Sequence, residues 1–182
     1  MTAVHLLAHF RTITEHRRLV RRYCLRLGLV RQGLTHDLSK YSPTEFLVGA
    51  KYWQGDRSPN DIERRETGVS LAWLHHKGRN RHHLEYWVDY VMKPDGTVSF
   101  EGLEMPIRYV AEMFCDRIAA SKIYLGEKYT DAAAYDYFVR SKDRIPIHEK
   151  TAAELEKMLE VLKDQGEDAA IEYVRTRLKE SS

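Results

Sequence analysis

Cysteine is scarce in this sequence, with only Cys24 and Cys115 among 182 residues. They lie far apart within apolar helical patterns, so the CxxC spacing of a zinc knuckle or a redox motif is missing. Long apolar runs are missing as well, because no stretch approaches the 18 residues that a membrane-spanning helix needs. Histidine and arginine occur too early in the N-terminal residues for a signal peptide. We therefore expect a cytoplasmic protein that makes no contact with a membrane.

An excess of charge of one sign is also missing. The 29 Lys and Arg residues and 27 Asp and Glu residues give a formal net charge of +2. A dedicated nucleic-acid-binding domain normally has a stronger basic bias, so we do not expect a nucleic-acid partner. With 43% hydrophobic and 31% charged residues, the composition is that of an ordinary globular domain. The length fits one domain over residues 1–182, and the sequence leaves oligomerisation open.

Helical periodicity covers most of the chain and predicts an all-α fold. Ser42 and Pro43 resemble a helix start, with Glu45 completing a capping box. Residues 86–101 suit a small β-hairpin around a Pro-Asp-Gly turn, and a helix over 84–92 is the alternative. The predicted helices cover about 3–27, 30–40, 43–53, 59–76, 107–125, 131–142, 147–164 and 167–180. The helices after residue 126 carry no site-like residues, so we expect residues 1–126 to hold the site and 127–182 to pack against it.

Histidine is abundant, with nine residues, and two of them are predicted to meet across a helical turn. If the chain reverses at Gly28, His16 lies about 18 Å before the turn and His36 about 12 Å after it, at 1.5 Å per residue. Antiparallel helices joined by a short loop would bring both side chains to a similar height. Asp37 follows His36 directly. His9 would lie about 10 Å further away than His16, which makes it the fallback.

Asp116 is a third candidate because it shares a helical stripe with apolar residues. A carboxylate in that position is costly unless it is paired or binds a metal. An ion pair with Arg117 is the alternative explanation. Two imidazoles and two carboxylates suit a divalent ion such as Mn²⁺, Fe²⁺, Co²⁺, Ni²⁺ or Zn²⁺, without selecting among them. The predicted ligands are His16, His36, Asp37 and Asp116.

The stretch from His75 to His83 is the most unusual in the sequence. It contains four histidines in nine positions, with polar and basic residues between them. A positively charged helix end, neutralised by Glu85 and Asp89, is the alternative to a functional site. The cluster consists of His75, His76, Lys77, Arg79, Asn80, Arg81, His82 and His83.

The order His, His-Asp, Asp resembles the HD superfamily of metal-dependent phosphohydrolases. The segment LTHDLSK is similar to that superfamily's signature, and the resemblance covers roughly residues 5–125. It implies an HD-like helical bundle in which the four predicted ligands hold a metal. Lys40 matches a lysine that contacts the substrate phosphate in part of the superfamily. Nucleotidases have a glutamate at that position, for which Glu45 would be a substitute.

Longer blocks, such as GLTHDLSKYSPTEF and AWLHHKGRNRHH, resemble a family of uncharacterised bacterial and phage proteins. The HD resemblance also implies a second metal, bound by His76 and by either His82 or His83. Lys40 together with Lys77, Arg79, Asn80 and Arg81 would then bind the phosphate.

The resemblance to the HD superfamily implies a metal-dependent phosphohydrolase that acts on a small phosphate ester, such as a nucleotide. Asp37 would be a metal ligand that also orients the attacking water, and Lys40 would offset charge on the phosphate. Two alternatives stay open: a di-iron oxygenase on the same scaffold, and a non-catalytic module that binds a metal or a nucleotide.

Overall fold

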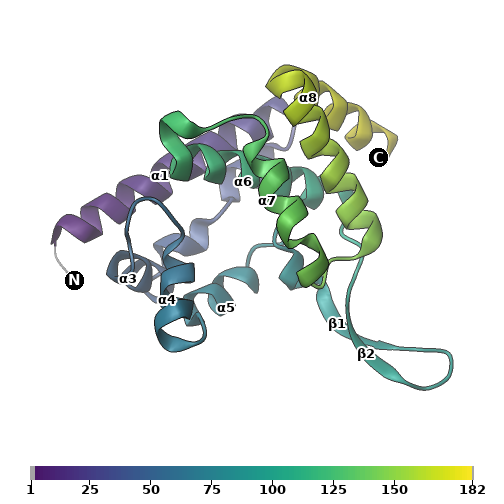
Figure 1. Cartoon of the computed structure of the whole chain (residues 1–182), viewed down its shortest axis with the longest axis horizontal. Helices are drawn as coiled ribbons and strands as arrows, with labels where there is room; N and C mark the ends of the chain where they lie inside the picture. Colours follow the sequence, from purple (N-terminus) through teal and green to yellow (C-terminus); the bar gives the residue numbers. More distant parts are fainter. Residues whose placement is uncertain (1–2, 182) are drawn as a thin grey trace.

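A computed structural model describes residues 3–181 and has an all-α architecture with one small sheet (Figure 1). The predicted fold class is thereby confirmed. Short 3-10 turns occur at η1 (Leu38–Tyr41), η2 (Leu84–Trp87), η3 (Gly126–Lys128) and η4 (Lys142–Arg144). The helices are α1 (Ala3–Arg26), α2 (Val30–Thr35), α3 (Pro43–Lys51), α4 (Pro59–Thr67), α5 (Leu71–Lys77), α6 (Ile107–Leu125), α7 (Ala133–Ser141) and α8 (Glu149–Glu180).

The main hydrophobic core lies between α1, α6, α7 and α8. Phe114 of α6 and Phe138 of α7 are fully buried in it, together with Leu159 of α8. Full burial of such side chains stabilises a fold by roughly 1.5–3 kcal/mol each. The C-terminal helices therefore share one core with α1 and α6.

Helices α3, α4 and α5 form a separate layer against one side of α1 (Figure 1). No residue of these three helices belongs to the main core cluster as the structure describes it. The ring of His9 packs against Phe46 of α3, and Trp53 Nε1 donates to Thr12 Oγ1 over 3.1 Å. The helix α5 carries part of the histidine cluster into the space between this layer and α6.

The hairpin prediction is correct, and the alternative helix over 84–92 is wrong. β1 (Val88–Met92) pairs antiparallel with β2 (Val98–Gly102), with Tyr90 opposite Phe100. The hairpin projects away from the helices (Figure 1), and both aromatic side chains are exposed. Within the described part of the chain, we find no helix with the length and apolar character needed to cross a membrane.

Glycines with positive φ break the helical chain at two places, Gly68 and Gly166. The helix predicted over 59–76 is two helices, because Gly68 adopts a φ of 82° and ends α4. Ser70 then caps α5 by accepting a hydrogen bond from the backbone N–H of Trp73. The break predicted between the helices over 147–164 and 167–180 is confirmed, because Gly166 within α8 has a non-helical φ of 83° and a ψ of 177°.

Candidate metal centre

The His36–Asp37 pair lies at a break in the backbone and not within a helix. The prediction of one helix over 30–40 is wrong, because α2 ends at Thr35 and His36 has the non-helical angles φ −47° and ψ 126°. Asp37 has a φ of 52° and is the one non-glycine residue with positive φ in the described chain. Aspartate tolerates this left-handed conformation better than most residues. Arg17 Nε donates to the carbonyl oxygen of His36 over 2.7 Å and so fastens the turn to α1.

The structure brings together all four residues predicted as the first cluster. Nε2 of His16 lies 2.9 Å from Oδ1 of Asp116 and 3.6 Å from Oδ2 of Asp37. Nε2 of His36 lies 3.4 Å from the same Asp37 oxygen and 3.5 Å from Asp116. These donor atoms all lie within 4.8 Å of one another, the proximity that a single ion requires. The fallback residue His9 is not in this group.

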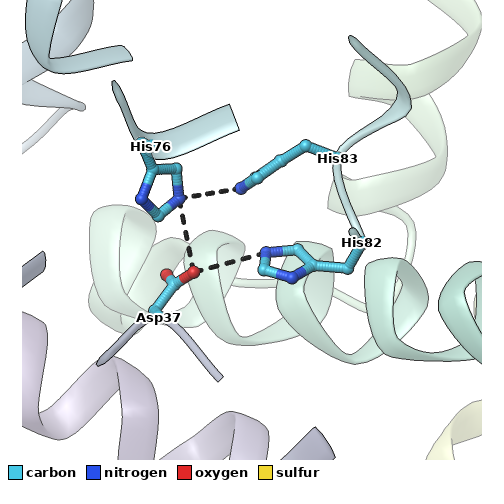
Figure 2. A group of neighbouring side chains, drawn as sticks. All are labelled: Asp37, His76, His82 and His83. Carbon is cyan, nitrogen blue, oxygen red and sulfur yellow. Dashed lines mark hydrogen bonds and ion pairs between the residues drawn. The ribbon is translucent and has the colours of Figure 1, made fainter. Parts of the chain in front are cut away.

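A second cluster forms on the other oxygen of Asp37 (Figure 2). Oδ1 lies 3.3 Å from Nε2 of His76 and 3.4 Å from Nε2 of His82. Nε2 of His83 lies 2.9 Å from Nε2 of His76. The sequence predicted that either His82 or His83 would face the site, and the structure brings both rings to it (Figure 2).

Asp37 therefore stands between two groups of ligand atoms, with one carboxylate oxygen directed to each. Its side chain is 1% exposed, and its Oδ1 has no hydrogen-bond partner among the described residues. Lys40 Nζ forms an ion pair with Oδ2 at 2.8 Å. Nε2 of His82 is also buried without a hydrogen-bond partner. Buried polar atoms normally have a partner, so orphaned atoms of this kind fit a centre that binds cations.

Two buried glutamates orient the histidine rings. Oε1 of Glu112 accepts a hydrogen bond from Nδ1 of His36 (2.9 Å) and forms an ion pair with Nδ1 of His82 (3.2 Å). Oε2 of Glu45 accepts from Nδ1 of His76 over 2.7 Å. A neutral imidazole that donates from Nδ1 carries its lone pair on Nε2. In that neutral form, each of these rings would direct the lone pair of Nε2 toward Asp37, as a metal ligand requires.

The sequence predicted that Glu45 completes a capping box with Ser42, and that prediction is wrong. Ser42 makes no side-chain cap at the start of α3. Glu45 instead bonds to His76 and, through Oε1 over 2.6 Å, to Nδ1 of His75. Two tertiary hydrogen bonds to imidazoles have replaced the local capping box.

The electrostatic field of the centre favours bound cations. Burial favours the uncharged carboxyl of Asp37, but His36 and Lys40 outweigh it and hold its pKa well below the ordinary value. The pKa of Asp116 is also well below its ordinary value because hydrogen bonds from His16 and His36 outweigh burial. Burial opposes protonation of His36, yet Asp37 and the neighbouring carboxylates raise its pKa to about 10. Without a metal, a proton on His36 compensates part of this negative charge.

Comparison with known proteins identifies the family to which this chain belongs. Residues 5–161 match DUF5662, a family of unknown function. The chain belongs to this family. No curated protein and no solved structure gives a significant match.

The region matched to DUF5662 contains both ligand clusters and both orienting glutamates. Of the predicted phosphate-binding residues, Lys40 is the one that contacts Asp37. Asn80 is buried, and its amide donates to the carbonyl of His76 over 2.8 Å, which fixes the loop after α5. Arg79 donates to the carbonyl of His75, and Lys77 is half-buried. Arg81 donates to Tyr109 Oη over 3.3 Å.

Glu112 is the site residue that the sequence reasoning missed. It precedes Asp116 by four residues on α6, so the two share one helix face. That spacing, together with an apolar surrounding, was the available signal. Glu112 is 5% exposed and would be costly to bury without its two histidine donors.

Proposed function

We propose that this DUF5662 protein is a metal-dependent phosphohydrolase with a two-ion centre, acting on a small phosphate ester. The observation that carries the proposal is the position of Asp37, whose two buried carboxylate oxygens face two separate sets of ligand atoms. The same order of residues in the sequence resembles the HD superfamily, whose members hydrolyse phosphate esters. Function resides in sites and not in folds, so the proposal depends on the chemistry of the side chains.

The donor set fits divalent ions. Five imidazoles and two carboxylates converge, and the Nδ1 atoms of three of the rings are already engaged by buried glutamates. A pair of ions held 3.5–4 Å apart, a typical spacing, lowers the pKa of a bound water and stabilises both the attacking and the leaving oxygen. The ligands are His16, His36, Asp37 and Asp116 on one side, and Asp37, His76, His82 and His83 on the other.

Lys40 supplies the positive charge that a phosphate ester needs. Its ammonium group lies 2.8 Å from Oδ2 of Asp37, and its side chain is 26% exposed. A cation at the edge of the centre would bind a phosphate oxygen while the rest of the substrate stays outside. The adjacent carboxylate raises the pKa of Lys40 despite burial, so the amine stays charged. Lys40 would therefore bind substrate and would not act as a base.

The test combines elemental analysis with a phosphatase assay. Purified protein is incubated with phosphate monoesters, including nucleotides, in the presence of Mn²⁺, Co²⁺, Mg²⁺ or Zn²⁺. We expect phosphate release that needs a metal and that falls at least 100-fold in Asp37→Asn and His16→Ala, since these remove ligands. His148→Asn is the matched control, because His148 only caps α8 through the N–H of Lys150 and asparagine is a good cap.

Two results would overturn the proposal. Protein that neither contains nor responds to a divalent ion would remove its basis. Bound iron with oxygen consumption, and no phosphate release under argon from any ester, would assign the centre to oxygenase chemistry instead.

A further inference from the structure

The two ligand sets differ in their donor atoms. The set around Asp116 offers two imidazole nitrogens and two carboxylate oxygens. The set around His76 offers three imidazole nitrogens and one carboxylate oxygen, from Asp37. We call these the Asp116 position and the three-histidine position. Both share Asp37, so the difference lies in the remaining side chains.

His83 is the residue that makes the three-histidine position rich in nitrogen. Its Nε2 lies 2.9 Å from Nε2 of His76. The Nδ1 of His76 donates to Glu45, so a neutral His76 has its lone pair directed at His83. His82 is oriented in the same way by Glu112 and has an unpartnered Nε2.

The ring of His83 is held in place and cannot easily turn away. It packs edge-on against Trp73, with ring centroids 4.7 Å apart, and lies 4.1 Å from the ring of His82. Figure 2 shows His76, His82 and His83 directed into one small space opposite Asp37. Ring nitrogens confined at this distance repel one another unless a proton or a cation lies between them.

Donor type separates the ions that each position prefers. Imidazole nitrogen suits Zn²⁺, Fe²⁺, Co²⁺ and Ni²⁺, whereas carboxylate oxygen suits Mg²⁺ and Mn²⁺. Replacing one carboxylate by an imidazole therefore raises both the affinity for the first group and the discrimination against Mg²⁺ and Mn²⁺.

We propose that the two positions hold different ions. The three-histidine position retains one ion of the Zn²⁺, Fe²⁺, Co²⁺ or Ni²⁺ class, and the Asp116 position holds an exchangeable ion that can be Mn²⁺ or Mg²⁺. The inference rests on the proposed two-ion centre and specifies which class of ion each position binds.

The experiment measures metal content and does not depend on turnover. The full chain, loaded with Zn²⁺ and Mn²⁺, is dialysed against a chelator of moderate affinity and analysed for metals at intervals. We expect Mn²⁺ to leave first and about one Zn²⁺ per chain to remain. The retained Zn²⁺ should be lost at least tenfold faster from His83→Ala, whereas Asp116→Asn should keep it and lose Mn²⁺ binding.

The control for folding is His83→Gln, which keeps a side chain that packs against Trp73 but removes the imidazole. It should behave like His83→Ala, with an unchanged helical circular dichroism spectrum. Release of both ions at one rate, or retained Zn²⁺ that responds to Asp116→Asn and not to His83, would overturn the inference. Two equivalent ions with phosphatase activity would refute it while leaving the proposed function intact. Absence of any bound ion would refute both.

Discussion

Replacement of Glu112 tests the centre without removing a proposed ligand. A single oxygen, Oε1, bonds to Nδ1 of His36 and pairs with Nδ1 of His82, and the two rings belong to different ligand sets. Loss of an outer partner of this kind typically weakens metal affinity about 10–100-fold, or about 1.4–2.8 kcal/mol per ion. Since Glu112 serves one ring in each set, Glu112→Ala should weaken both positions, by about 3–6 kcal/mol in total.

Glu112→Gln separates orientation from charge. The amide oxygen can still accept both hydrogen bonds, but hydrogen bonds to a charged acceptor are roughly twice as strong as neutral ones. We therefore expect about half of the free-energy loss seen in Glu112→Ala.

Affinities are measured by competition with a chromophoric chelator, after circular dichroism has shown that the helices are intact. Glu66→Gln, at an exposed position of α4, is the matched control and should leave both affinities unchanged. Affinities of Glu112→Ala within twofold of the wild type at both positions would refute the orienting role. Weakening of one position alone would limit that role to a single histidine.

Three further predictions concern the fold and its protons. A Cβ atom at Gly49 would clash with the imidazole ring of His9, so Gly49→Ala should destabilise the protein by about 1–3 kcal/mol, and an unchanged urea midpoint would contradict this contact. Gly166→Ala should cost about 1–2 kcal/mol, because φ is 83° at the kink of α8, and a melting temperature equal to the wild type would show that the kink is not required. A metal must displace the proton that Asp37 and its neighbours stabilise on His36, despite burial, up to a pKa of about 10. Apparent metal affinity should therefore rise with pH towards that value with release of protons, and calorimetry that finds no proton release at pH 7–8 would rule this out.

The first cluster could be predicted because its geometry follows from helix dimensions. Similar distances along the helices on either side of Gly28 placed His16 near His36, and the cost of a buried carboxylate pointed to Asp116. The break at Asp37 could not be seen in the same way. Leu34 and Leu38 continue an apolar helical spacing, and the turn depends on tertiary contacts such as the Arg17 hydrogen bond to the His36 carbonyl.

Two other differences from the prediction concern the helix break at Gly68 and the partners of Glu45. Gly68 followed by Ser70 is a helix stop and a new N-cap, and the structure uses both. Glu45 matched the capping-box spacing, but two histidines 30 and 31 residues away compete for its carboxylate. Sequence periodicity reports which face of a helix is buried, and it does not report which partner a buried acid will find.

The position of the centre between two layers has a consequence for the protein without metal. The layer of α3, α4 and α5 contributes nothing to the main core cluster, and its His76 and Glu45 approach α6 through the polar centre. Bound ions would thus hold this layer against α6, where other proteins have apolar packing. Stripping them should open this layer to amide hydrogen exchange and proteolysis long before α6 and α8 loosen, so metal supply would govern how long the chain survives.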